Sequence, residues 1–458
     1  MKKPEKGCQR GERDKLNKKD ILFIGLMLFA LFFGAGNLIF PPFLGMEAGT
    51  SFWPAIIGFV VTGVSLPVLA VVAIALAKNG IMSIARTVHP IFGLIFTVAV
   101  YLAIGPFFGI PRGASVAYEM GVKPFQSADA SSLFLTLFMV FFFAIVYGLS
   151  LNPSKLVDRI GQLLTPALLL AIAALCVTAF VRFDAPLQPP TEKYAETPFF
   201  KGFLEGYLTM DTIAALAFGI IVINALKEKG VKEKGQLIKA TVSAGIVAGI
   251  GLTLVYGSVG WIGAKLASAG PFENGAIILT ESAQLLFGPA GKVLLGAIVG
   301  LACLTTCIGL VSACSQFFHE NWPKVSYKAF VGLLTLVSFL IANIGLDGII
   351  SISVPVLVML YPFAIVLVGL TFLRPLFKGS RKVYVGAVLM TGIFSLNDGL
   401  AALGMKIEAL EALLSIVPLY SVGLGWVLPA IAGGVIGWII DQVCKSPDNP
   451  VHSIKTQS

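Results

Sequence analysis

LFFGAGNLIFPPFLG, residues 31–45, forms the second half of an apolar stretch that runs from Ile21 to Leu44. A run of about 20 apolar residues is long enough to cross a lipid bilayer as a helix. Glycines, an asparagine and a Pro-Pro pair interrupt this run, and glycine and proline both weaken a helix. Irregular backbone at that depth is tolerated only where it is buried in protein or lines a cavity. The stretch therefore predicts a broken first span whose freed amides and carbonyls hold a solute or an ion.

The whole chain has the composition of a polytopic membrane protein. Of its 458 residues, 57% are hydrophobic and 12% are charged, whereas soluble domains carry about 25% charged residues. The formal net charge is +9, but the basic residues lie in short loops and one tail and form no basic-aromatic face for nucleic acid. The six cysteines predict neither a disulfide framework nor a metal site, because most lie in apolar stretches without an accompanying histidine.

Twelve apolar segments predict twelve membrane helices. They cover residues 21–44, 53–77, 91–118, 131–150, 160–181, 204–226, 237–262, 290–318, 329–343, 348–373, 383–401 and 418–442. With the N-terminus in the cytoplasm, 25 of the 33 Lys and Arg residues fall on the inner side. Cytoplasmic loops carry such an excess of basic residues, so we expect both termini in the cytoplasm. The longest outer loop would be 182–203, and a partly amphipathic external helix would lie near 270–288.

Ionisable residues inside a span are costly and therefore mark candidate functional positions. Asp211 lies in GYLTMDTIAALAFG, residues 206–219 of the sixth predicted span, among glycines and threonines that suit an opened helix. We expect this span to open between Asp211 and Gly219. Alternatively, Asp211 caps a helix at the water boundary. Arg112 follows Pro111 in the third span, where it either neutralises Asp211 or extends its guanidinium toward water.

Thr305 and Thr306 lie together near the middle of the eighth predicted span. Their hydroxyls either donate to carbonyls of their own helix or join carbonyls of a broken helix around a small cation. His89, His319 and His452 fall in predicted inner loops or the tail, which argues against a histidine proton relay. The sequence contains no Gly-Lys-Ser/Thr phosphate loop and no Ser/His/Asp set. We therefore expect neither ATP-driven transport nor an enzyme.

Four motifs resemble those of the branched-chain amino acid:cation symporters, the bacterial branched-chain amino acid transport system II carriers. They are GAGNLIFPPFLG at 34–45, GPFFGIPRGASVAYE at 105–119, GYLTMDTIAALAFG at 206–219 and SVPVLVMLYP at 353–362. The resemblance implies a sodium-coupled carrier, or in some members a proton-coupled one, that takes up leucine, isoleucine and valine. It further implies the bacterial inner or plasma membrane, and no cofactor other than sodium as the coupling ion.

This family is similar in turn to the five-plus-five inverted-repeat superfamily typified by the bacterial leucine transporter. The similarity implies an all-α fold with helices 1 and 6 broken and two helices appended after the repeats. The expected parts are a basic cytoplasmic tail at 1–19, a first repeat at 20–203, a second repeat at 204–373, helices 11 and 12 at 374–443, and a cytoplasmic tail at 444–458.

The resemblance also implies a substrate site at the first break. Amides of Gly34, Ala35 and Gly36 would take the substrate carboxylate, and the side chain of Asn37 would help to bind one sodium ion. The sequence departs from the superfamily in the spacing of Asn37 and Pro41, which is shorter than in the leucine transporter. It also departs in the sixth span, where Asp211 and Thr212, which we expect to contact the substrate, stand in place of an aromatic lid and a threonine.

A second sodium site is implied between the first and eighth spans. LTT at 304–306 is similar to the superfamily's Leu-Thr-Ser/Thr, so the hydroxyls of Thr305 and Thr306 would bind the ion with carbonyls of Ala30, Phe33 and Ala302. Sodium there would stabilise the outward-open state, and one helix bundle would then rock against the other.

The charges of an amino acid substrate indicate which groups would hold it. The carboxylate of a zwitterionic amino acid would meet the positive end of the half-helix after Gly36. The ammonium would meet carbonyls of the broken sixth span or Asp211, and Phe107, Phe108 and Phe218 would line an apolar pocket. The alternatives are proton coupling through Asp211, a carrier of another small solute such as a nucleobase, a channel, or a nutrient receptor.

Overall fold

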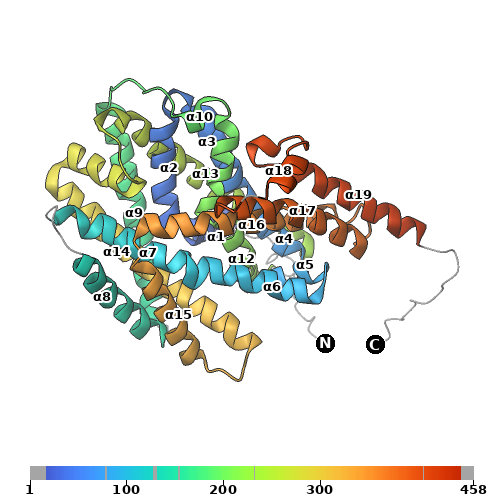
Figure 1. The fold of residues 1–458 in the computed structure, drawn as a ribbon. Helices are drawn as coiled ribbons and strands as arrows, with labels where there is room; N and C mark the ends of the chain where they lie inside the picture. Colours follow the sequence, from blue (N-terminus) through green and yellow to red (C-terminus); the bar gives the residue numbers. More distant parts are fainter. Residues whose placement is uncertain are drawn as a thin grey trace, which may run out of the picture.

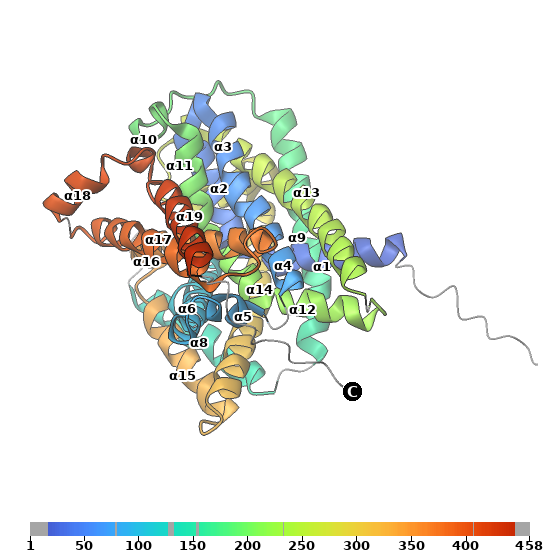
Figure 2. The same ribbon diagram turned by 90° about the vertical axis from the view of Figure 1, so that its right-hand side faces the viewer.

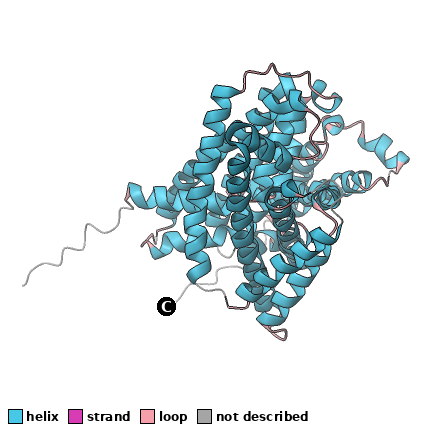
Figure 3. Cartoon of the chain, turned by 90° about the vertical axis from the view of Figure 1, so that its left-hand side faces the viewer, coloured by secondary structure: helices cyan, strands magenta, loops and turns pink. Residues whose placement is uncertain are grey.

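The computed structural model describes residues 17–77, 80–126, 132–152, 155–231, 233–405 and 407–444, with side chains except those of residues 132 and 155–165. Within these residues the chain is built from helices and connecting loops, with no strand (Figure 3). The expected all-α class is therefore confirmed. The two predicted cytoplasmic tails lie almost entirely outside the described residues.

All twelve predicted apolar segments coincide with helices (Figure 1). In the first half of the chain these are α1 (Lys18–Phe32), α2 (Ala35–Ala48), η1 (Gly49–Ser51), α3 (Phe52–Val60), η2 (Val61–Ser65), α4 (Leu66–Leu76), α5 (Gly80–Arg86), α6 (Pro90–Leu102), η3 (Ala103–Phe107), α7 (Gly109–Gly121), η4 (Lys123–Phe125), α8 (Ser132–Ser150), α9 (Lys155–Arg182), α10 (Glu192–Ala195) and α11 (Pro198–Glu205). The second half contains η5 (Gly206–Thr209), α12 (Asp211–Glu228), α13 (Lys234–Leu266), η6 (Ala267–Ala269), α14 (Gly275–Asn321), α15 (Tyr327–Ala342), α16 (Leu346–Leu373), α17 (Arg381–Ala402), α18 (Glu408–Leu414), η7 (Tyr420–Val422) and α19 (Val427–Val443).

The number of membrane crossings is less sharply defined than the number of apolar segments. By length and composition, seven helices of the described chain could cross a membrane, or eight if the bent pair α11–η5 and α12 counts as one span. Other predicted segments lie on α1 or on the shorter apolar helices Pro166–Arg182, Tyr327–Ala342 and Val427–Val443. Twelve crossings and the inverted repeat therefore stay predictions.

The first predicted span is broken, as expected. α1 ends at Phe32, Phe33 and Gly34 are extended, and α2 begins at Ala35. The Pro-Pro pair was expected to contribute to the break, but Pro41 and Pro42 lie inside α2. Because proline has no N–H to donate, the pair still leaves the carbonyls four residues earlier without their usual intrahelical donor.

The sixth predicted span is also broken, although at a different place from the one expected. We predicted the opening between Asp211 and Gly219, but these residues are helical and begin α12. The break lies at Met210, whose φ of 65° is left-handed and interrupts the path from η5 into α12. The axes before and after it differ by 44°. Asp211 therefore occupies the first turn of the second half-helix.

Backbone-to-backbone contact fixes α2 against α13. A Cβ added at Gly45 would overlap the carbonyl oxygen of Gly260, and one added at Gly263 would overlap the carbonyl oxygen of Pro42. Removing side chains at such positions lets two helix backbones approach closely within a membrane. The first half-helix is thus held by the long α13 beside it.

The predicted outer loop is tied to the ends of both broken spans. Lys193 in α10 forms ion pairs with Glu47 of α2, at 2.9 Å, and with Glu205 of α11. Partial burial alone would lower the pKa of Lys193, but the two carboxylates outweigh it and raise that pKa above its usual value. Lys193 thus stays charged at neutral pH and joins the two half-helices at this end of the bundle.

The C-terminal helices project from one side of the molecule. Figure 1 shows α17 and α19 extending to the right of the remaining helices, and Figure 2 shows α18 at the outer left edge of the molecule. Asn397 and Asp398 lie inside α17, where Asn397 Nδ2 donates to the Tyr420 hydroxyl at 3.0 Å.

The close approach of α2 and α13 predicts the effect of a single methyl group. Gly263→Ala should lower the thermal stability of the purified protein in detergent, because forced overpacking costs about 1–3 kcal/mol. Gly257→Ala in the same helix is the matched control, since a Cβ there would meet nothing within 4 Å. Equal melting temperatures for the two variants would contradict this account of the α2–α13 contact.

Candidate functional site

Asn37 joins the two helix breaks. It lies in the first turn of α2, where its Oδ1 accepts from the Gly34 N–H at 3.0 Å. Its Nδ2 donates to Oδ2 of Asp211, at 2.7 Å, in the first turn of α12. Asn37 is 1% exposed and Asp211 is 3% exposed. One buried side chain therefore holds the half-helices of the first and sixth spans together.

Tyr256 completes the hydrogen bonding around Asp211. It comes from the middle of α13, its hydroxyl donates to Asp211 Oδ2 at 2.9 Å, and Asn37 Nδ2 also contacts that hydroxyl. Two donors thus converge on one carboxylate oxygen. An ionised carboxylate has about four lone-pair sites, so Asp211 keeps the capacity to accept from a further cationic group.

Arg112 brings a buried positive charge to the same breaks. It lies in α7 and is 1% exposed. Its Nη1 donates to the carbonyl of Leu208 at 2.5 Å, and its Nη2 donates to Ser353 Oγ at 3.3 Å. The guanidinium also lies 5.0 Å from the centre of the Phe40 ring, and its Nε has no hydrogen bond.

The guanidinium lies close to the start of α2. A Cβ added at Gly36 would be 3.2 Å from Arg112 Nη1 and 3.4 Å from Cα of Thr209. Arg112 and Asp211 do not pair within 4.0 Å, and no carboxylate of the described residues forms an ion pair with Arg112. Arg112 is therefore buried rather than extended toward water, and its guanidinium contacts a carbonyl, a hydroxyl and a ring instead of a carboxylate.

The π-helical segment η2 contacts the residues on both sides of the break in the sixth span. In η2, Thr62 donates to the carbonyl of Phe203 at 2.7 Å, and its own carbonyl accepts from the Thr212 hydroxyl at 3.4 Å. A Cβ at Gly206 would overlap the Thr62 hydroxyl. Thr212, predicted to bind substrate, thus turns its hydroxyl toward η2 and is fully buried.

The three phenylalanines predicted to line a pocket do not gather around the breaks. Phe218 lies seven residues after Asp211, about 10 Å along α12, and packs edge-on against Tyr101. Phe108 is buried beside the kinked segment η3. Phe107 is 39% exposed, so it covers little of any buried site. The aromatic pair that does lie near the break is Tyr207 stacked on Tyr361, with ring centres 4.4 Å apart.

The predicted sodium ligands are only partly assembled. The hydroxyls of Thr305 and Thr306 both donate to the carbonyl of Ala302, at 3.0 Å and 2.9 Å. This is the own-helix bonding that we held open as the alternative. Neither hydroxyl bonds to Ala30 or Phe33 of the first span, although each oxygen keeps lone pairs that can face a cation. Asn37, the other predicted ligand, has its oxygen engaged by Gly34.

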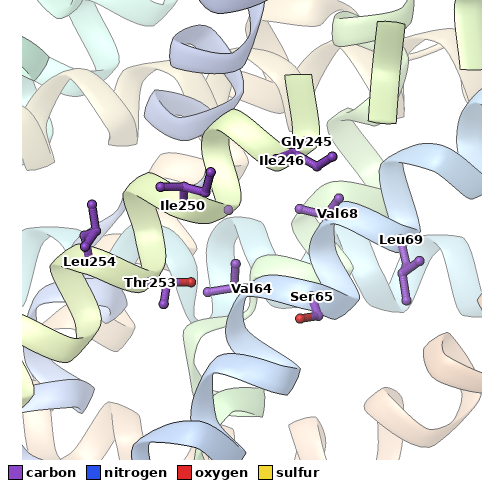
Figure 4. A pocket seen from close by; sticks show the side chains of 10 residues that line it. Val64, Ser65, Val68, Leu69, Gly245, Ile246, Ile250, Thr253 and Leu254 are labelled. Carbon is purple, nitrogen blue, oxygen red and sulfur yellow. The ribbon is translucent and has the colours of Figure 1, made fainter. Parts of the chain in front are cut away.

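A separate hollow of about 520 Å³ lies between α13 and the segment formed by η2 and α4 (Figure 4). Its walls are apolar apart from Ser65 and Thr253, and Ile246, Ile250 and Leu254 are exposed around it. Within a membrane such a surface faces lipid tails. The hollow is therefore not part of the polar site at the breaks.

Sequence reasoning missed Tyr256, Ser353 and Thr62. Tyr256 gave the clearest available signal, because a tyrosine in the middle of an apolar span needs a partner for its hydroxyl. Ser353 and Thr62 gave none, since serine and threonine can bond to their own helix.

Two solved structures share this arrangement of helices. The inward-facing conformation of Mhp1 aligns over 94% of this chain and 95% of its own, with a TM-score of 0.62 and 14% identity. MhsT in complex with L-phenylalanine aligns over 94% and 99%, with a TM-score of 0.53 and 15% identity. These likenesses show that the chain has the fold of these two structures.

Sequence comparisons specify the family. The model described as branched-chain amino acid transport protein matches residues 17–444. The branched-chain amino acid permease BrnQ of Bacillus subtilis is 49% identical over 429 residues, which cover 93% of this chain and 98% of the relative. The chain belongs to the family of branched-chain amino acid transport proteins. The family resemblance expected from the four motifs is therefore confirmed.

The hydrogen bonds to Asp211 predict how removal of each donor changes the stability of the protein. Tyr256→Phe and Asn37→Ala should each lower the melting temperature of the purified protein at neutral pH, because a buried carboxylate that loses a donor costs about 1–3 kcal/mol. Tyr147→Phe is the control, since Tyr147 is 41% exposed. If all three variants have the melting temperature of the wild type, the Asn37–Asp211–Tyr256 cluster does not stabilise the fold.

Proposed function

We propose that this protein takes up leucine, isoleucine and valine by sodium-coupled symport with alternating access. The observation that carries the proposal is the burial of two opposite charges, Arg112 and Asp211, at the paired helix breaks without an ion pair between them. Isolated buried charges are costly unless something compensates them. A zwitterion bound between the breaks would supply both missing partners.

The substrate carboxylate would bind at the start of α2. The first N–H groups of a helix lack intrahelical partners and carry the positive end of its dipole. Gly34 already donates to Asn37, so the amides of Ala35 and Gly36 are the ones left for a ligand. The Arg112 guanidinium beside Gly36 would add a charge-assisted bond to the same carboxylate.

The substrate ammonium would bind at Asp211. Asn37 and Tyr256 fix one oxygen of this carboxylate, which orients the group before the ligand arrives. Carbonyls freed by Pro41, Pro42 and the turn at Met210 would supply further acceptors. The apolar side chain of the amino acid would lie near the stacked rings of Tyr207 and Tyr361 beside the break. One apolar pocket should accept all three substrates, because a single methylene is worth about 1–3 kcal/mol of discrimination.

The coupling ion would lie between the first and eighth spans. We propose sodium, held by the hydroxyls of Thr305 and Thr306 and the carbonyls of Ala30, Phe33 and Ala302. The hydroxyls would turn from Ala302 toward the ion, which prefers oxygen ligands. The second candidate is proton coupling, favoured by the buried carboxylate of Asp211. In both cases the protein would lie in the bacterial cell membrane with both termini inside.

Substrate analogues test the two charged groups separately. In proteoliposomes, Arg112→Ala and Asp211→Asn should each lower kcat/KM for labelled leucine by about tenfold or more, since a bond to a charged group is worth about 1.5–3 kcal/mol. Arg112→Ala should weaken competition by isocaproate, which has only the carboxylate. Asp211→Asn should weaken competition by isoamylamine, which has only the ammonium. The zwitterion assignment is wrong if each variant affects both analogues equally.

Imposed ion gradients test the coupling. Uptake of labelled leucine should require an inward sodium gradient, and Thr305→Ala should raise the sodium concentration for half-maximal rate severalfold. Thr178→Ala is the matched control, because the Thr178 hydroxyl also donates only to its own helix, to Ala174 at 2.7 Å. Equal uptake under a pH gradient in sodium-free buffer would instead assign the coupling to protons and to Asp211.

A further inference from the structure

A cavity of about 270 Å³ lies next to the breaks, at the end of the bundle that carries α10. α2, α11 with η5, α16 and the start of α14 enclose it. Its apolar walls are Ile39, Phe40, Phe43, Leu208, Ile350 and Val354. This volume lies just below the size of about 300 Å³ at which ligand sites in proteins begin, so only a small molecule fits the cavity. Under the predicted topology it opens to the outside of the cell.

Asn274 gives the cavity a buried donor without a partner. It lines the cavity immediately before α14, is 4% exposed, and its Oδ1 accepts from the N–H groups of Ala276 and Ile277 at 3.1 Å and 3.2 Å. Its Nδ2 makes no hydrogen bond. A buried unsatisfied donor is costly, and the adjoining helix start carries positive potential. Both features favour a carboxylate at this point.

Acidic side chains line the other part of the cavity. Asp347 lies in the first turn of α16, and among the described residues no basic group forms an ion pair with it. Glu273 is held only by a 3.9 Å pair with Lys123, whereas Glu205 is closely paired with Lys193. Asp347 is therefore the carboxylate most available to an ammonium group.

Two residues that line the cavity also contact Arg112. Phe40 and Leu208 line the cavity, and both contact this guanidinium, Phe40 through its ring and Leu208 through its carbonyl. A ligand in the cavity would thus be separated from the breaks only by the residues that hold Arg112. Movement of Phe40 and Leu208 would connect the two sites.

We propose that this cavity is a second binding site for the transported amino acid, occupied before the site at the breaks. Asn274 and the start of α14 bind the carboxylate, Asp347 binds the ammonium, and Phe40, Phe43 and Ile350 contact the apolar side chain. This inference rests on the proposed function, because it takes a zwitterion with an apolar side chain as the ligand.

Substitutions at Asn274 separate its two roles. Serine is a good N-cap, so Asn274→Ser keeps the acceptor for the α14 amides and removes only the Nδ2 donor. In proteoliposomes, Asn274→Ser and Asp347→Asn should each raise the KM for external leucine severalfold and leave kcat unchanged. Asn343→Ser is the control, since Asn343 follows α15, close in sequence to α16, and does not line the cavity. An unchanged KM, or a loss of kcat alone, would overturn the second site.

Protection from thiol labelling gives an independent readout. Ser351 lines the cavity and is exposed, so Ser351→Cys should react with a membrane-impermeant methanethiosulfonate, with wild-type protein as the background. Leucine should slow this reaction, should still slow it when Asn37→Ala disables the site at the breaks, and should lose its effect with Asn274→Ser. Absence of protection, or protection lost with Asn37→Ala, would overturn the proposal. Failure of the wild type to take up leucine would instead refute the proposed function.

Discussion

The hydrogen bond from Asn37 to Asp211 is the interaction on which the rest of the site depends. It links the first turn of α2 to the first turn of α12, so the second halves of both broken spans share one buried contact. The same asparagine also satisfies the Gly34 amide. Two helix breaks leave many backbone groups without partners, and a single amide side chain that serves both breaks keeps their relative position defined.

The polar cluster is stable within a membrane only because each element around it supplies a hydrogen-bond donor or acceptor. α13 contributes Tyr256, α7 contributes Arg112, α16 contributes Ser353 and η2 contributes Thr62. The same elements present apolar side chains to their other neighbours. Charge is thereby concentrated in one small volume, and the surrounding helices remain compatible with lipid.

The sequence was sufficient to predict the helical class, the positions of the apolar segments and the existence of both breaks. These follow from hydropathy and from glycine and proline, which act locally. The position of the second break was wrong because it depends on Met210, a residue with no intrinsic preference for left-handed backbone. Asp211 and Arg112 were identified as candidates from their cost inside a span. The sequence indicates that the Tyr256 hydroxyl needs a partner but not that this partner is Asp211, because Tyr256 and Ser353 reach the site through packing of distant segments.

The structure does not gather the aromatic residues that local patterns indicated. Phe107, Phe108 and Phe218 were selected because they adjoin the broken motifs, yet the kinked η3 leaves Phe107 exposed and the helical path of α12 carries Phe218 away from Asp211. Tyr207 and Tyr361, which do stack beside the break, come from spans far apart in the chain. A side chain's distance from a motif along the sequence is a poor guide once the backbone bends.

The glycine contacts between α2 and α13 have a mechanical consequence. Surfaces that meet through main-chain atoms have no flexible side chains between them to absorb sliding. Both helices must therefore move together as one rigid unit in any motion that opens the site to the other side of the membrane. One pivot of this pair is then the extended segment at Phe33 and Gly34, where the chain before α2 is not helical.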